Sequence, residues 1–218
     1  MCPTKTNAQQ FNPDQVAAVV LCGGRGLRMG GADKGLQRLH GKTLAAIALQ
    51  RLKNQHGGSP ALVAINANRN LDEYTSLRVP VWPDTLPNFA GPLADMLSAL
   101  QHMPEDFGYL LCVPCDSPRF PLNLLQRLGG ALLAHDAEIA MAEAPDSDGV
   151  MRHQPVFCLI RTQLYSDLAS FLQQGGRKIG TWADRHRLTH VAFGSTGDDD
   201  LSFHNINSLD ALHQLESL

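Results

Sequence analysis

The 218-residue sequence lacks the features that would place it in several common classes of protein. It has no excess of positive charge, since 18 lysines and arginines stand against 21 aspartates and glutamates, a formal net charge of −3. This balance disfavours general binding to nucleic acid or to membrane surfaces. No window approaches the roughly 20 apolar residues that span a bilayer. The first 15 residues are polar and contain no apolar stretch of signal-peptide length.

Cysteine is too scarce for a disulfide framework. The five cysteines are odd in number, and Cys22, Cys112 and Cys158 lie in apolar runs. Disulfide frameworks occur in small, cysteine-dense secreted chains, so we expect a cytoplasmic location. Cys112 and Cys115 form a Cys-x-x-Cys pair, but two further ligands at compatible spacing are missing. Core packing is therefore favoured over a zinc site.

Several familiar motifs are also missing. The dinucleotide fingerprint Gly-x-Gly-x-x-Gly matches at Gly24 and Gly26 but has Met29 in its third position. The Walker loop matches at Gly41-Lys-Thr43 but has Leu36 where its first glycine must stand. No Gly-x-Ser-x-Gly or His-Glu-x-x-His segment occurs. These absences disfavour a dinucleotide-dependent oxidoreductase, a P-loop protein and a serine hydrolase of the nucleophile-elbow type.

What the sequence does contain is an alternation of short apolar runs and helical patterns. Apolar residues make up 44% of the chain, enough for a sizeable core. Several runs are apolar along their whole length, which favours an α/β fold with a mostly parallel sheet and helices on both faces, a three-layer arrangement. We expect a polar tail over 1–15 and a single domain over 16–218. Strands are predicted at 17–22, 61–65, 79–82, 108–113, 138–144, 155–160 and 191–193, and helices after Thr43, from Pro92, over 122–133 and 162–173, and from Ser208.

A glycine-rich loop from Gly23 to Gly35 follows the first strand directly. Glycines let backbone N–H groups approach an anion, and Arg25, Arg28 and Lys34 supply positive charge for phosphates. The alternative is a flexible loop whose basic residues are only solvated. Between Arg25 and Lys42 five basic residues accompany one acidic residue, whereas the rest of the chain has 13 basic and 20 acidic residues. A local cationic loop on an acidic body suits a small triphosphate better than a nucleic acid.

The loop resembles the signature of the molybdenum cofactor guanylyltransferases, which belong to the nucleotidyltransferases with a Rossmann-like fold. The matching pieces are Leu21-x-Gly-Gly24, Arg28-Met-Gly and Asp33-Lys-Gly. Cys22 and Gly26 stand where the family often has alanine or another small residue. The resemblance runs from about Val19 to Leu215 and includes, in order, Gly41-Lys42, Asn66-Ala-Asn68-Arg69, Asp84, Gly91-Pro-Leu93, Cys115-Asp-Ser-Pro118, His153-Gln-Pro155 and Asn205-Ile-Asn207.

The resemblance implies transfer of GMP from GTP to the terminal phosphate of molybdopterin, with release of pyrophosphate. It implies that Asp116 holds Mg²⁺, with Mn²⁺ as a possible substitute, and that Lys34 and Arg28 neutralise the leaving pyrophosphate. The implied GTP-binding residues are Leu21, Cys22, Gly23, Gly24, Lys34, Asn66, Asp84 and Asp116, and those on the acceptor side are His153, Asn205 and Asn207.

Each of these residues also has an ordinary structural interpretation. Asp116 could cap the helix expected from Pro121, and Asp84 could cap a turn before Pro87. Asn66 is a natural turn residue. Asn205 and Asn207 could cap the last helix, and His153 could be a plain surface histidine.

Alternative functions remain open from the sequence. A cytidylyltransferase or a sugar-phosphate nucleotidyltransferase would share the fold, although a cytidylyltransferase typically has Leu-Ala-Ala-Gly where this chain has Leu21-Cys-Gly-Gly24. A non-catalytic GTP-binding module is the alternative from another class. The resemblance further implies molybdenum insertion proteins or molybdoenzyme chaperones as protein partners.

Overall fold

The computed structural model describes residues 10–23, 33–85, 91–146, 148–194, 199, 201–206 and 212. Its centre is a seven-stranded sheet with the strand order β5-β4-β1-β6-β8-β7-β9. The strands are β1 (Val16–Leu21), β4 (Leu62–Asn66), β5 (Val81–Trp82), β6 (Tyr109–Pro114), β7 (Ile139–Pro145), β8 (Met151–Arg161) and β9 (Leu188–Ala192). A separate two-stranded hairpin consists of β2 (Arg38–Leu39) and β3 (Lys42–Thr43).

The sheet is mostly parallel, as predicted. The neighbours β5, β4, β1 and β6 pair in parallel, and so do β7 and β9. Only β8 runs against its neighbours within this sheet, because it pairs antiparallel with both β6 and β7. The four parallel strands β5, β4, β1 and β6 therefore end at one common edge of the sheet. The residues that directly follow these strands lie at this edge.

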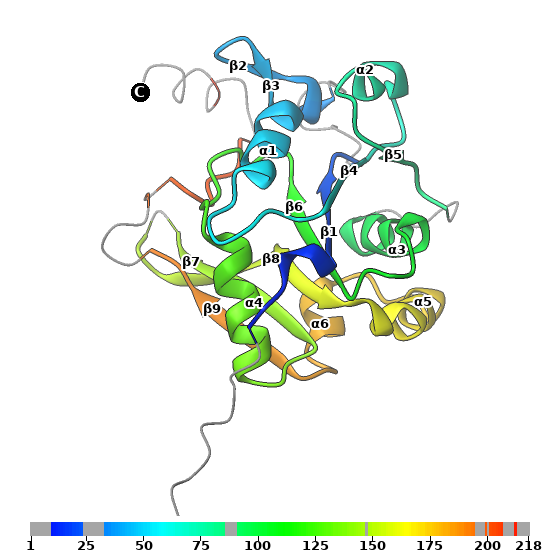
Figure 1. Ribbon diagram of the computed structural model, residues 1–218, viewed down its shortest axis with the longest axis vertical. Helices are drawn as coiled ribbons and strands as arrows, with labels where there is room; N and C mark the ends of the chain where they lie inside the picture. The colour runs from blue at the N-terminus through cyan, green and yellow to red at the C-terminus, as the bar shows by residue number, and fades with distance from the viewer. Residues whose placement is uncertain are drawn as a thin grey trace, which may run out of the picture.

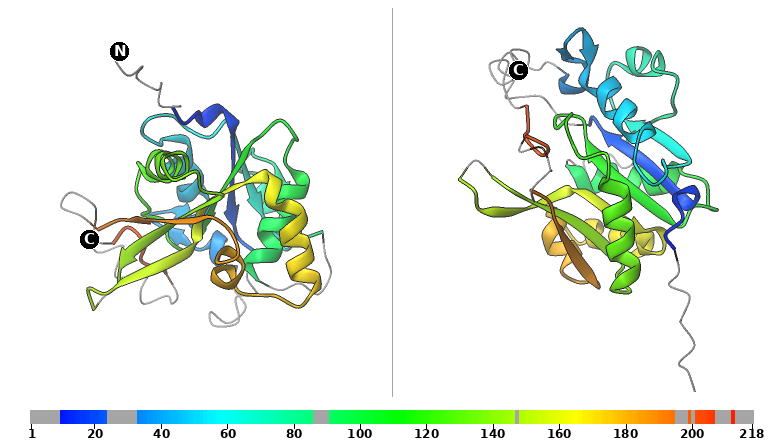
Figure 2. Two further views of the ribbon diagram at one scale, coloured as in Figure 1. Left: turned by 90° about the horizontal axis from the view of Figure 1, so that it is seen from below. Right: turned by 60° about the vertical axis from the view of Figure 1, so that its left-hand side comes forward.

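Helices cover both faces of the sheet, which gives the expected three layers (Figures 1 and 2). On one face α1 (Leu44–Lys53) and α4 (Leu124–Ala134) pack against the sheet. On the other face α3 (Pro92–His102), α5 (Tyr165–Gln173) and α6 (Ile179–Ala183) form a second core. A short helix, α2 (Leu71–Thr75), and 3-10 turns over Pro13–Gln15, Lys34–Leu36 and Thr162–Leu164 complete the described elements.

Local sequence explains where the main helices begin. The Thr43 hydroxyl accepts a hydrogen bond from the backbone N–H of Ala46 at 3.2 Å, which caps α1 as expected. Pro92 occupies the first turn of α3, where its missing N–H costs nothing. Gly91 precedes it with φ of 116°, a conformation that residues with a side chain rarely adopt.

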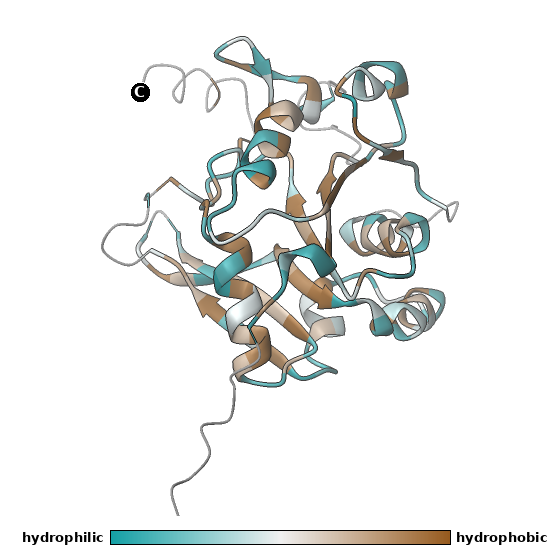
Figure 3. Ribbon diagram, in the orientation of Figure 1, coloured by the Kyte–Doolittle hydropathy of each residue, from teal (hydrophilic) through white to brown (hydrophobic). Residues whose placement is uncertain are grey.

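The central strands are buried on both faces, which explains their continuous apolar character. All six residues of β1 are buried, and alternate residues face the two cores. Figure 3 shows the corresponding run of hydrophobic colour through the middle of the molecule. Apolar and polar residues therefore do not alternate along these strands, because neither face of the strands meets water.

The predicted elements agree with the structure except in their bounds and at the ends of the chain. Strand β8 begins at Met151, well before the predicted residue 155, since its polar first half pairs with β7 outside the core. The expected helix from Ser208 falls outside the described residues apart from Leu212. The tail boundary at residue 15 stays a prediction, although Phe11 within it packs against Tyr109 at a ring distance of 5.3 Å. Within the described part of the chain, no helix has the length and apolar content of a membrane span.

Candidate functional site

Three strand ends meet at one edge of the sheet. Leu21 at the end of β1 pairs with Asn66 of β4 on one side and with Pro114 of β6 on the other. The ladder continues one residue further, because the Cys22 N–H donates to the Asn66 carbonyl at 2.9 Å. The Cys115 N–H likewise donates to the Leu21 carbonyl at 3.2 Å. The carboxyl ends of such strands are where ligands bind in open α/β sheets.

An ion pair joins two candidate residues that are far apart in sequence, Lys34 and Asp116. Lys34 Nζ lies 3.2 Å from Asp116 Oδ2, and the two side chains are 23% and 21% exposed. Both groups therefore remain accessible to a ligand. Asp116 does not cap α4, which begins only at Leu124, so that alternative is wrong.

The position of Lys34 is fixed by its neighbour Asp33, whose carboxylate accepts several hydrogen bonds. The Asp33 carboxylate accepts from the Gly35 N–H at 3.1 Å, from Tyr74 Oη at 2.5 Å and from Asn70 Nδ2 at 3.0 Å. Tyr74 is fully buried, and burial together with the nearby Cys22 and Asp33 raises its pKa, so its hydroxyl stays protonated and donates. A Cβ on Gly35 would lie 2.4 Å from Tyr74 Oη, so only glycine lets the loop approach this closely.

We expect Tyr74→Phe to loosen this anchor. The substitution removes the hydroxyl donated to Asp33 and should lower the free energy of unfolding by about 1–3 kcal/mol. The resemblance implies that Lys34 binds the nucleotide, and Asp33 precedes it, so we expect the KM for the nucleotide to rise more than kcat falls. Urea unfolding and steady-state kinetics check the two effects. Tyr165→Phe is the matched control, since its hydroxyl accepts from Gln101 at 2.9 Å on α5, away from this edge. An unchanged midpoint in Tyr74→Phe would contradict the anchoring role.

A second group of polar side chains links the end of β4 to the segment after β5. Asn66 Nδ2 donates to the Trp82 carbonyl at 2.9 Å and to Asp84 Oδ1 at 3.0 Å. Asn68 Nδ2 donates to Asp84 Oδ2 at 2.8 Å, and the Asp84 N–H donates back to Asn68 Oδ1 at 2.7 Å. Asn66 is the last residue of a strand and not a turn residue, so its turn interpretation is wrong.

Asp95 belongs to this network and was missed from the sequence. It lies in the first turn of α3, where an acidic residue is usually explained by the helix dipole. Here it is 6% exposed, and burial together with the nearby Asp84 raises its pKa to about 7. A protonated Asp95 can donate the hydrogen bond that joins it to Asp84. No pattern in the sequence indicates this burial, because an acidic residue in a first helical turn is ordinarily exposed.

One acceptor in the network is unused. Asn66 Oδ1 is buried and has no hydrogen-bond partner among the described residues. A Cβ on Gly23 would lie 3.0 Å from this oxygen and 3.0 Å from both carboxylate oxygens of Asp95. The glycine therefore keeps the approach to Asn66 Oδ1 free of a side chain. An unpartnered buried oxygen is costly unless a ligand or water satisfies it.

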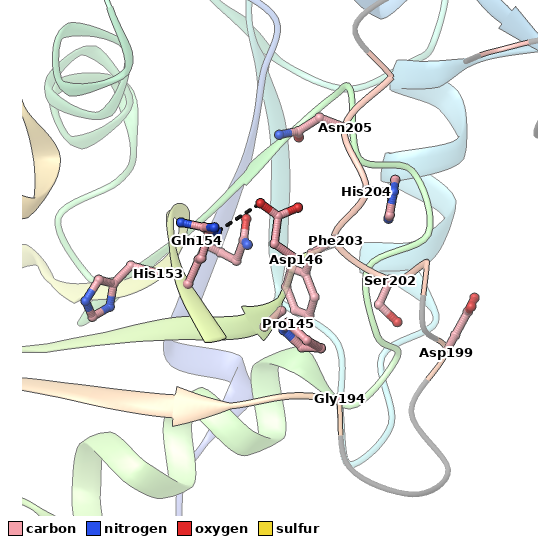
Figure 4. A pocket seen from close by; sticks show the side chains of 12 residues that line it. Pro145, Asp146, His153, Gln154, Gly194, Asp199, Ser202, Phe203, His204 and Asn205 are labelled. Atoms are coloured by element: carbon pink, nitrogen blue, oxygen red, sulfur yellow. Dashed lines mark ion pairs between the residues drawn. The ribbon is translucent and has the colours of Figure 1, made fainter. Parts of the chain in front are cut away.

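The predicted acceptor-side residues His153 and Asn205 line one pocket. It has a volume of about 300 Å³ and also includes Asp146, Gln154 and His204 (Figure 4). Asn205 accepts a hydrogen bond from the buried Ser117 hydroxyl, one residue after Asp116. The next residue, Ile206, donates its N–H to the Asp116 carbonyl at 2.7 Å. The pocket thus adjoins the Lys34–Asp116 pair from the β8 side.

The cysteine pair is a packing feature, as predicted. Cys112 and Cys115 are buried on opposite faces of the sheet, so they cannot ligate one ion. Burial and the neighbouring thiols, Cys158 for Cys112 and Cys22 for Cys115, raise both pKa values. Cys22, Cys112, Cys115 and Cys158 are all free thiols.

Three predicted site residues, Gly24, Arg28 and Asn207, lie outside the described residues.

Comparison with known proteins shows the family to which this chain belongs. Residues 18–188 match the MobA-like NTP transferase domain family. The molybdenum cofactor guanylyltransferase of Albidiferax ferrireducens is 49% identical over 206 residues, covering 93% of this chain and 96% of that protein. That of Methylibium petroleiphilum is 50% identical over 207 residues, covering 94% and 97%. This chain belongs to the molybdenum cofactor guanylyltransferase family. The resemblance seen in the sequence is thereby confirmed.

Solved structures confirm the fold of this guanylyltransferase family member. Molybdopterin-guanine dinucleotide biosynthesis protein A from Archaeoglobus fulgidus superimposes with a TM-score of 0.71 at 22% identity, covering 93% of this chain and 97% of that one. The 4-diphosphocytidyl-2C-methyl-D-erythritol synthase from Anaerococcus prevotii gives a TM-score of 0.73 at 10% identity, covering 95% and 96%. The expected nucleotidyltransferase fold is therefore correct.

Proposed function

We propose that this protein transfers GMP from GTP to the terminal phosphate of molybdopterin. The observation that carries the proposal is the Lys34–Asp116 pair at the shared strand edge, in a chain with guanylyltransferase relatives. A phosphate oxygen of the acceptor attacks the α-phosphorus of GTP, the bond to the β-phosphate oxygen breaks, and pyrophosphate leaves. The product is the guanine dinucleotide form of the cofactor.

The reaction needs no side-chain nucleophile, because the acceptor phosphate is already an anion. The protein's part is to position two polyanions and to offset their charge. Lys34, with Arg28, neutralises the charge that grows on the leaving pyrophosphate. The backbone from Leu21 to Gly24 holds the nucleotide beside the end of β1.

The residues at the edge fit a divalent cation. Asp116 offers a carboxylate that is accessible and already faces a positive group, Lys34 Nζ at 3.2 Å. Mg²⁺ binds proteins through one or two carboxylates and takes its other ligands from phosphates and water. Asp116 would hold Mg²⁺, or Mn²⁺ in its place, and the bound ion would neutralise the triphosphate.

The amide and carboxylate network accounts for nucleotide recognition. Asn66 Oδ1 is an acceptor without a partner, and guanine presents its N1–H and its amino group as donors. Asp84, which follows β5, is fixed by Asn66 and Asn68 and contacts the nucleotide from that side. A site that leaves a buried acceptor unpaired with the wrong base discriminates strongly against it.

The acceptor binds in the pocket that His153 and Asn205 line, and Asn207 is proposed as a further acceptor contact. Arg152 also lines the pocket, and it pairs with Asp146 at 3.0 Å and with Asp148. We place the reaction in the cytoplasm. We propose that the product is passed to molybdenum insertion proteins or molybdoenzyme chaperones.

A panel of nucleoside triphosphates tests the proposal. With molybdopterin and Mg²⁺, GTP should release pyrophosphate at least about a hundredfold faster than CTP, ATP or UTP, by kcat/KM. Omitting molybdopterin is the control that separates transfer from hydrolysis. Preference for CTP would make the protein a cytidylyltransferase. Turnover with a sugar phosphate as acceptor would indicate a sugar-phosphate nucleotidyltransferase. GTP binding without turnover would indicate a non-catalytic module.

A further inference from the structure

Three potential metal ligands converge where β7, β8 and β9 extend beyond the helices. Glu143 of β7 pairs directly with His153 of β8 in the antiparallel ladder. His190 of β9 stands opposite Met141, so it lies diagonally across from Glu143 on the parallel side. The three side chains meet on the sheet face that Met141 shares with the second core. The strand register therefore builds this cluster, and no loop is needed to assemble it.

The three ligand atoms form a compact triangle. His153 Nδ1 lies 2.9 Å from Glu143 Oε1, His190 Nδ1 lies 3.5 Å from the same oxygen, and the two Nδ1 atoms are 3.1 Å apart. Ligands at zinc bond lengths of about 2.0–2.2 Å in a tetrahedron are separated by about 3.3 Å. The observed edges match one face of such a tetrahedron. Among the described residues this is the only His, Cys, Asp and Glu group with such convergence.

Protons alone satisfy this triangle poorly. A neutral imidazole carries one N–H, and two Nδ1 atoms in contact can share only one hydrogen between them. If instead both Nδ1–H groups donate to Glu143 Oε1, the two nitrogens stay 3.1 Å apart with no hydrogen bond between them. One cation at the centre would satisfy all three lone pairs at once.

We propose that Glu143, His153 and His190 bind one first-row transition-metal ion, with Zn²⁺ as the best fit. Imidazole nitrogens favour zinc and its neighbours over magnesium, so this site is chemically distinct from Asp116. The side chains of His153, His190 and Glu143 are 58%, 33% and 26% exposed, which leaves the fourth position open to water or to an incoming ligand. His153 also borders the pocket, and in Figure 4 its ring lies apart from Asp146 and Asn205.

Calorimetry with Zn²⁺ tests the site directly. The full-length chain, free of any affinity tag, is titrated with Zn²⁺ alone, without nucleotide, Mg²⁺ or molybdopterin. We expect one equivalent to bind, and a large excess of Mg²⁺ should not displace it. His190→Ala, His153→Ala and Glu143→Gln should each weaken Zn²⁺ binding at least about tenfold. Mutating a residue that only hydrogen-bonds to a metal ligand already lowers metal affinity by about this factor. All three side chains are on the surface, so circular dichroism should show an unchanged fold.

Two controls separate this site from other zinc ligands. His135→Ala removes an exposed histidine after α4 and should leave the affinity unchanged. Asp116→Ala should likewise keep the zinc equivalent, even where it abolishes transfer. Visible absorption bands of bound Co²⁺ in the wild type, lost in His190→Ala, would confirm coordination by the cluster. The proposal is overturned if the wild type binds no stoichiometric Zn²⁺. It is equally overturned if the three variants bind Zn²⁺ as tightly as His135→Ala.

Discussion

Asp116→Ala should reduce guanylate transfer at least about a thousandfold while the protein stays folded, because we propose Asp116 as the ligand of the metal and such a ligand contributes several kcal/mol of transition-state stabilisation. The side chain pairs with Lys34 and is 21% exposed, so its removal leaves no buried cavity. Its backbone carbonyl still accepts from the Ile206 N–H, so the contact between these two segments is kept. The loss should therefore appear in kcat and not in the unfolding transition.

Pyrophosphate release from GTP with molybdopterin measures this effect, and urea unfolding measures the stability. Asp184→Ala is the matched control, since it removes an exposed carboxylate at the end of α6 on the far face. Asp116→Asn keeps the shape and removes the charge, so it should resemble Asp116→Ala if the charge is what matters. Transfer by Asp116→Ala at near wild-type rate would remove this residue from the metal site.

Asp95→Asn should stabilise the protein at pH 8 but not at pH 4. The carboxyl of Asp95 has an ordinary pKa of 3.8 when the chain is unfolded and about 7 when it is folded. The folded state therefore binds a proton that the unfolded state releases between these two values. Stability from this group is complete below about pH 4 and is lost as the pH rises through 7.

The size of the effect follows from the pKa difference. A shift of about three units corresponds to at most about 4 kcal/mol between the two ends of this range. Asparagine is neutral at every pH, and its amide can still donate to Asp84. The gain of Asp95→Asn over the wild type should thus rise from near zero at pH 4 to a few kcal/mol at pH 8.

Urea midpoints of both proteins at several pH values check the expected trend. Asp106→Asn, which replaces an exposed carboxylate after α3, should show no comparable rise with pH. A difference between Asp95→Asn and the wild type that does not change with pH would mean that Asp95 is charged in the folded protein. The hydrogen bond to Asp84 would then need another donor.

The sequence predicted the sheet well because its central strands obey one simple physical rule. Strands such as β1 and β6 are buried on both faces, so their apolar runs are continuous and end where the polar edge begins. The same rule placed Asn66 and Asp116 at strand ends. It failed for β8, whose first residues are polar because they pair only with β7 beyond the helices.

The charged residues of the candidate site could be predicted from the sequence. The residues that hold them in place could not. Lys34 and Asp116 could be named from the motifs, but their 3.2 Å approach required the fold. Asp95 gave no signal, because an acidic residue in a first helical turn is usually a solvent-exposed partner of the helix dipole. The convergence of His153 with His190 depends on the order of β8, β7 and β9, which no local pattern reveals.

The pairing of β1 with β6 couples ligand binding to folding of the whole chain. Val16 pairs with Tyr109, so this contact closes a very long loop, and β4 supplies the other side from between them in sequence. Contacts so distant in sequence form late and cooperatively. The edge that joins Leu21, Asn66 and Asp116 thus exists only in the completed sheet. A nucleotide bound at this edge, as we propose, would add its binding free energy to that of global unfolding, and not to the opening of a single loop.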